Sequence, residues 1–184
     1  SLTREAVLLQ PDIIVWPETM FPTPMRLVAE GVTDKQVLEQ LPRDLLQAYG
    51  NDTDPLIQNW RAEDVQKRLQ MHAQASGAAL VIGVETAVAG KDRIKLYNSA
   101  AFVRPDLGYT GRYDKIHRVV FGEYIPLKSI FPWLHKLTPF GSNFGIDEGD
   151  SVRMFECGGH RIAPLICFED TVPDLVRKVA AQRD

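Results

Sequence analysis

Three side chains with complementary chemistry lie far apart in the sequence, each at the end of an apolar or strand-like stretch. Glu18 follows "DIIVWP", Lys115 ends "RYDK" and Cys167 follows "IAPLI". A carboxylate can take the proton of a thiol, and an ammonium can stabilise both a thiolate and a developing oxyanion. The three residue types therefore predict nucleophilic catalysis by Cys167, if the fold brings them together.

Each of these residues also has a purely structural interpretation. Free cysteines are among the most often buried residues and most do no chemistry. Charged residues at strand ends are usually solvated. Spacing alone does not show that Glu18, Lys115 and Cys167 converge, so the elements that carry them decide between the two interpretations.

Three short apolar runs predict strands. They are rich in Ile, Val and Leu, too short for helices, and apolar at successive positions, which is typical of strands buried on both faces. Two hairpins are predicted as well, one turning near Pro105 and Gly108 and one at Gly158-Gly159. The three apolar runs are residues 12–16, 79–84 and 162–168.

Two helices are predicted beside these strands. Residues 59–77 carry a helical apolar stripe that ends at Gly77. A second helix begins soon after Cys167, with Thr171 as a capping residue and Pro173 in its first turn. Strands mixed with helices indicate a layered α/β domain.

Residues 20–60 are predicted to be an irregular insertion within one domain that spans residues 1–184. Prolines at 22, 24, 42 and 55 interrupt this segment, and "GNDTDP" is typical of a surface loop. A short helix near 34–48 is the only regular element expected there.

The composition excludes several classes of function. The chain has 184 residues, 45% of them hydrophobic, and a net charge of −3 with scattered basic residues, so nucleic-acid binding is not expected. No stretch reaches the roughly 18 apolar residues of a membrane span. Two cysteines make no disulfide framework. No metal and no cofactor are expected, because the histidines fit no metal-ligand spacing: His72, His117, His135 and His160.

Three blocks of sequence carry a family resemblance. "VWPET" (15–19), "GRYDKIHRVVFGEYIPL" (111–127) and "LICFEDTVPDLVR" (165–177) resemble, in order, the signature blocks of the nitrilase or carbon–nitrogen hydrolase superfamily. The Trp-Pro-Glu-Thr wording and the Phe-Gly-Glu-Tyr-Ile-Pro run are most similar to its apolipoprotein N-acyltransferases. The resemblance implies an αββα sandwich and a Glu18–Lys115–Cys167 triad.

The resemblance also marks supporting residues. Glu123 matches a family glutamate close to the triad that orients the lysine or stabilises the intermediate, and an unpaired carboxylate at this apolar position would be costly. Glu169 matches a position that the acyltransferases need, although an acid leading a helix also favours its dipole. Phe168 is expected to help hold the oxyanion through its backbone N–H, and it stands where these enzymes usually carry Tyr.

The implied reaction moves a fatty acyl group from a phospholipid, through a thioester on Cys167, to the α-amine of the N-terminal diacylglyceryl-cysteine of an apolipoprotein. Relative to the family, the domain is expected to be truncated at both ends, and the flanking membrane helices are absent from this chain. The implied location is the bacterial inner membrane, with the catalytic domain on the periplasmic side.

Two other functions are consistent with parts of the sequence. A soluble amidase or nitrilase-type hydrolase would use the same triad with water as the acceptor, and the wording of the blocks argues against it. A non-catalytic domain that keeps the fold for interaction is disfavoured because all three triad residues are present.

Overall fold

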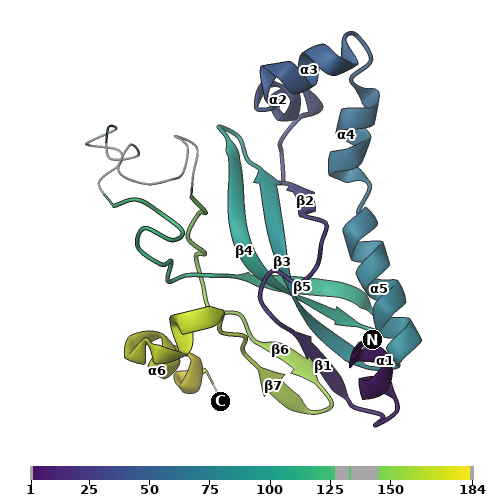
Figure 1. Ribbon diagram of the computed structural model, residues 1–184, viewed down its shortest axis with the longest axis vertical. Coiled ribbons are helices and arrows are strands. Elements are labelled where there is room, and N and C mark those ends of the chain that lie inside the picture. The colour runs from purple at the N-terminus through teal and green to yellow at the C-terminus, as the bar shows by residue number, and fades with distance from the viewer. Residues whose placement is uncertain (1, 127–132, 134–144, 183–184) are drawn as a thin grey trace.

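The computed structural model describes residues 2–126, 133 and 145–182 and forms an α/β fold built on one central sheet (Figure 1). The α/β class is therefore confirmed. The helices are α1 (Leu2–Val7), α2 (Asp34–Glu39), α3 (Arg43–Tyr49), α4 (Asp54–Arg61), α5 (Asp64–Ser76), the 3₁₀ helix η2 (Cys167–Thr171) and α6 (Pro173–Ala181). The strands are β1 (Ile13–Trp16), β2 (Met25–Val28), β3 (Ala79–Ala89), β4 (Ile94–Arg104), β5 (Gly108–Asp114), β6 (Phe155–Cys157) and β7 (His160–Ile162).

The central sheet has the order β1-β3-β4-β5, and β2 also pairs with β3. Both β1 and β2 are parallel to β3, but β1 pairs with residues 79–82 and β2 with residues 86–89. They therefore lie one after the other along the same edge of β3. Between them the chain leaves this edge and carries Glu18 past the middle of β3.

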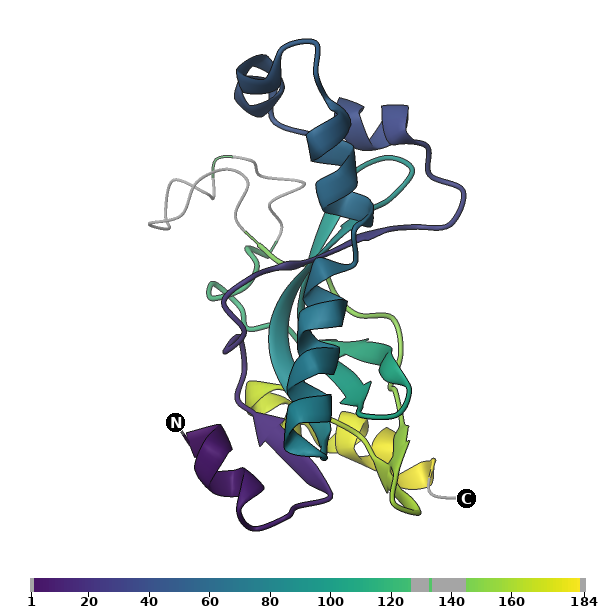
Figure 2. The same cartoon turned by 90° about the vertical axis from the view of Figure 1, so that its right-hand side faces the viewer.

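Both faces of β3 are covered over residues 79–84, as the unbroken apolar run predicts. On one face Leu80 and Ile82 pack into a cluster with Leu69 of α5. On the other face Phe102 of β4 stacks on Phe155 of β6, with ring centroids 4.8 Å apart. The two-stranded β6–β7 sheet thus forms a second layer, and α5 lies on the opposite face (Figure 2).

The predicted helix before β3 is confirmed, with a later start. Val65, Leu69 and Ala73 are spaced four residues apart on α5, and all three are buried against the sheet. The helix ends at Gly77, whose φ of 66° is the left-handed conformation that glycine adopts readily. The two hairpins, β4–β5 and β6–β7, are confirmed as well.

Residues 20–60 are more regular than the sequence predicts. They contain β2 and the helices α2, α3 and α4, where one short helix is expected. Trp60, Leu56 and Val37 form a small apolar cluster with Ala89 at the end of β3. This cluster holds the helices at the end of the sheet that lies far from both termini (Figure 1).

The predicted strand over residues 162–168 is wrong. Strand β7 ends at Ile162, and residues 163–166 have no regular structure before η2 begins at Cys167. Pro164 has no N–H to donate to a neighbouring strand. The Ile166 N–H donates instead to the Glu169 carboxylate at 2.8 Å. Cys167 therefore sits on a turn braced by a side chain, and not at the end of a buried strand.

Two smaller expectations also fail. Strand β1 is not buried on both faces. On the face that it shares with Phe102, Ile13 packs against the apolar cluster but Val15 is 65% exposed. Thr171 does not cap the following helix. The residue before α6 is Val172, and the Thr171 hydroxyl donates to the Phe168 carbonyl at 2.7 Å.

Candidate active site

Glu18 is held in place by a close approach of two backbones. A Cβ atom at Gly83 would lie 2.2 Å from the Pro17 carbonyl oxygen and 2.7 Å from the Cα of Glu18. Only glycine leaves room for this crossing in the middle of an apolar strand. The Phe21 N–H then donates to the Gly83 carbonyl at 3.1 Å, which fixes the far side of the turn.

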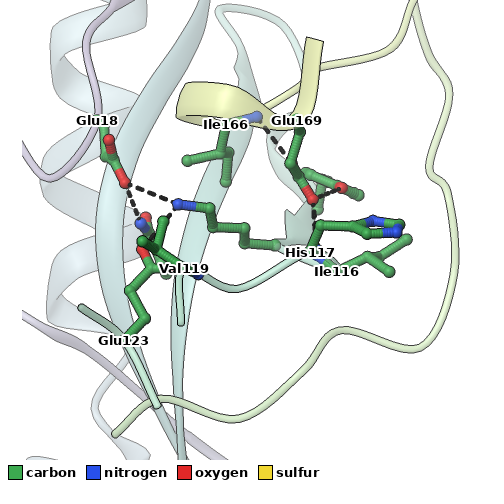
Figure 3. A network of polar contacts seen from close by, with 10 residues as sticks. Glu18, Ile116, His117, Val119, Glu123, Ile166 and Glu169 are labelled. Carbon is green, nitrogen blue, oxygen red and sulfur yellow. Dashed lines mark hydrogen bonds and ion pairs between the residues drawn. The ribbon is translucent and has the colours of Figure 1, made fainter. Parts of the chain in front are cut away.

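Lys115 follows β5 directly and is fixed at both its backbone and its side chain. Its N–H donates to the Asn98 carbonyl at 2.9 Å, and its carbonyl accepts from Gly149 N–H at 2.8 Å. Its side chain is fully buried. The Nζ atom lies 2.7 Å from Glu123 Oε1 and 3.4 Å from Glu18 Oε1 (Figure 3).

The ammonium of Lys115 is stabilised by these carboxylates. Burial works to lower its pKa, but the hydrogen bond to Glu123 and the charges of Glu123 and Glu18 outweigh burial, so the pKa lies above its ordinary value. The charge that Cys167 carries as a thiolate would raise this pKa further. A buried, positively charged lysine near Cys167 is suited to stabilise a thiolate or an oxyanion.

Cys167 is exposed and stands on a strained turn. Its φ is 58°, a region that non-glycine residues enter rarely and at a cost. Cys167 and Glu18 line one cavity of about 320 Å³. An exposed thiol that lines the same cavity as a glutamate can pass its proton to that residue when the two side chains come within hydrogen-bond reach, directly or through one water.

Glu169 ties the turn that carries Cys167 to the loop that follows Lys115. Its carboxylate is fully buried and accepts four hydrogen bonds, all between 2.8 and 2.9 Å (Figure 3). The donors are the Tyr113 hydroxyl and the N–H groups of Ile116, His117 and Ile166. The four hydrogen bonds that Glu169 accepts explain an acid at this position better than an interaction with the dipole of the following helix does.

Glu123 and Phe168 complete the surroundings of Lys115. Glu123 also accepts from the Val119 N–H at 2.8 Å, so its carboxylate is fixed before it meets the ammonium. The Phe168 ring centroid lies 5.7 Å from Lys115 Nζ, within the range of a cation–π contact. The structure thus brings all six predicted site residues into one region.

Two residues of this region escaped the sequence reasoning. Asn98 donates from Nδ2 to Glu18 Oε1, and Tyr113 donates its hydroxyl to Glu169. Burial and the adjacent Glu169 carboxylate raise the pKa of Tyr113 far above its ordinary value, so the hydroxyl stays a donor. The sequence does contain a signal for Asn98, because Asn98 and Ser99 are polar residues directly before the apolar residues 100–103 of the same strand.

No group of three or more His, Cys, Asp or Glu side chains within the described residues is arranged to hold a metal ion. His135 and Leu127, which belong to the histidine count and to the second signature block, lie outside the described residues.

A mixed sheet covered by helices, with a cysteine, a lysine and a glutamate in one region, defines an α/β fold with a candidate active site. The sequence profile of the family described as Carbon-nitrogen hydrolase matches residues 1–183. The chain therefore belongs to the carbon–nitrogen hydrolase family.

Curated relatives share the resemblance seen in the signature blocks. The apolipoprotein N-acyltransferase of Rhodopirellula baltica is 29% identical over 88% of this chain, and that of Bdellovibrio bacteriovorus is 30% identical over 93%. The enzyme of that name from Geobacter metallireducens is 34% identical over 60% of the chain. The chain spans only 29%, 27% and 21% of the lengths of these relatives, respectively.

Solved structures confirm the fold. A variant of the amidase from Nesterenkonia sp. AN1 matches 98% of this chain with a TM-score of 0.52 at 16% identity, covering 54% of the amidase. A second variant, described as an amidase from the nitrilase superfamily, gives the same TM-score at 15% identity, with 98% of this chain and 52% of the amidase covered. Across residues 2–126 and 145–182, no helix is long and apolar enough to span a membrane.

Proposed function

We propose that this chain is the catalytic part of an N-acyltransferase that uses Glu18, Lys115 and Cys167 as a triad, within one domain that spans residues 1–184. The observation that carries the proposal is the fully buried Lys115 ammonium, which lies 3.4 Å from Glu18 Oε1, while Glu18 lines one cavity with Cys167. The similarity to apolipoprotein N-acyltransferases supports acyl transfer as the reaction.

In the first half of the reaction, Glu18 takes the proton of the Cys167 thiol. The thiolate attacks the ester carbonyl of a phospholipid, and a C–S bond forms. Lys115 and the backbone N–H of Phe168 stabilise the oxyanion. The C–O bond then breaks, Glu18 returns the proton to the leaving alcohol, and a thioester remains on Cys167.

In the second half, a neutral amine attacks the thioester carbonyl and a C–N bond forms. Glu18 takes the proton that the amine loses, the C–S bond breaks, and the proton returns to the sulfur of Cys167. The proposed acceptor is the α-amine of a diacylglyceryl-cysteine at the N-terminus of an apolipoprotein. The proposed setting is the periplasmic face of the bacterial inner membrane.

Product analysis tests this proposal against hydrolysis. The full-length protein is incubated with a radiolabelled phospholipid and a peptide that begins with S-diacylglyceryl-cysteine. We expect the label in an amide on the peptide, in a reaction that is lost in Cys167→Ala. Release of free fatty acid at the same rate with and without the peptide would identify a hydrolase instead.

A further inference from the structure

Glu18 also lines a second hollow. It has a volume of about 630 Å³ and takes in both carboxylates that contact Lys115. We call it the acidic hollow. The lining residues that matter here are Glu18, Arg26, Glu85, Leu96, Asn98 and Glu123.

Charge in the acidic hollow is not balanced by the groups around it. Glu18 and Glu123 share one ammonium, that of Lys115. Glu85 adds a third carboxylate to the lining and Arg26 adds a second cation, so the described charged groups that line or contact the hollow carry one uncompensated negative charge. A ligand with a single positive charge would neutralise it.

Asn98 also lines the hollow, and its side chain has a hydrogen-bond acceptor without a partner among the described residues. Its side chain is 8% exposed, and its Nδ2 is committed to Glu18. Its Oδ1 is buried and has no hydrogen-bond partner among the described residues. Asn98 pairs directly with Glu85 across β3 and β4, so both side chains stand on one face of the sheet. A buried acceptor without a donor is costly and indicates a missing N–H.

We infer that the acidic hollow binds the amino group of the acyl acceptor, an inference that rests on the proposed function. Glu85 and Asn98 provide a carboxylate and a carbonyl oxygen for a primary ammonium, and apolar Leu96 faces the carbon chain attached to it. Glu18 lines both the acidic hollow and the cavity of Cys167. An amine held against Glu18, once it has lost one proton to solvent, is therefore beside the base that serves its attack on the thioester.

Glu85 allows a test that leaves the proposed triad intact, because its side chain is exposed and takes no part in the contacts of Lys115. Binding is measured by calorimetry in full-length Cys167→Ala protein, which cannot turn over. The ligands are a peptide beginning with S-diacylglyceryl-cysteine and its N-acetylated form. Glu30→Gln, an exposed glutamate outside the lining, is the matched control.

We expect Glu85→Gln to weaken binding of the free-amine peptide about 3- to 5-fold, as loss of a partly exposed ion pair would. Binding of the N-acetylated peptide should not change, and Glu30→Gln should affect neither ligand. Equal effects of Glu85→Gln on both ligands, or no effect on either, would overturn the inference. The proposed function is tested separately by thioester formation in a Glu85→Gln protein that retains Cys167, because that step needs no acceptor. Absence of a thioester in both this protein and the wild type would count against the proposed function and not against the amine site alone.

Discussion

Lys115 Nζ lies closer to Glu123 Oε1, at 2.7 Å, than to Glu18 Oε1, at 3.4 Å. The principal partner of the buried ammonium is thus Glu123, the acid outside the proposed triad. Glu18, whose side chain is 34% exposed, also lines the cavity of Cys167. This division leaves Glu18 available to accept a proton while Glu123 holds the lysine.

Replacing Glu123 with Gln should therefore impair the formation of the thioester without touching the thiol. The ammonium loses its shortest contact and shifts, and a misplacement of this kind costs about 100-fold in rate. The rate is measured by intact-mass analysis of full-length protein mixed with phospholipid. Glu148→Gln, which breaks the partly exposed Arg118–Glu148 pair, is the control and should retain its rate.

The pH dependence of the rate of thioester formation should differ between the wild type and Glu123→Gln. Because the pKa of Lys115 is raised above 10.5, its charge, and the stability that the charge contributes, are complete below pH 10.5 and are lost as the pH rises through the raised value. In Glu123→Gln, burial still lowers the pKa of Lys115, but the carboxylate that raises this pKa most is gone. The rate of this variant should decline at a lower pH than that of the wild type. Superimposable alkaline limbs would argue against this account of Lys115.

Gly83→Ala tests how Glu18 is positioned. The added methyl group would meet the Pro17 carbonyl oxygen at 2.2 Å, so the segment that carries Glu18 must move. We expect a loss of about 1–3 kcal/mol in the free energy of unfolding, measured with urea, together with slower thioester formation. Gly90→Ala, where the nearest atom is 3.1 Å away, should cost less and leave the rate unchanged.

Glu169 should stabilise the site in proportion to the hydrogen bonds that it accepts. In Glu169→Gln, one oxygen becomes an NH₂ group, which leaves either Ile166 N–H or the other three donors unpaired. Unfolding experiments should show a loss of about 2–3 kcal/mol, against about 1 kcal/mol for Tyr113→Phe, which removes one donor. Equal losses in the two variants would contradict the proposed link between the cysteine turn and the lysine loop.

The sequence predicted those parts of the fold that depend on local pattern. The unbroken apolar run before Gly83, the stripe of Val65 and Leu69, and the Gly158-Gly159 turn each determine an element through short-range physics. Glu18, Lys115 and Cys167 stood out because each ends an apolar or strand-like stretch, and Glu123, Glu169 and Phe168 followed from the resemblance of the signature blocks to the family.

What the sequence did not reveal depends on contacts between distant segments. The apolar run around Pro164 has the composition of a strand, but the Ile166 N–H pairs with Glu169 instead of a neighbouring strand. Strand β2 forms because Met25 reaches Thr86 of β3, and no local pattern announces that pairing. Asn98 became visible as a site residue only when β4 brought it to Glu18.

Intact-mass spectrometry of full-length protein exposed to phospholipid tests the central claim most directly. The chain has two free cysteines, the exposed Cys167 and the half-buried Cys157, so each serves as the control for the other. We predict one acyl group added to the wild type and to Cys157→Ala, released by hydroxylamine as a thioester should be, and none added to Cys167→Ala. An acyl adduct of normal yield on Cys167→Ala would contradict the assignment of Cys167 as the nucleophile.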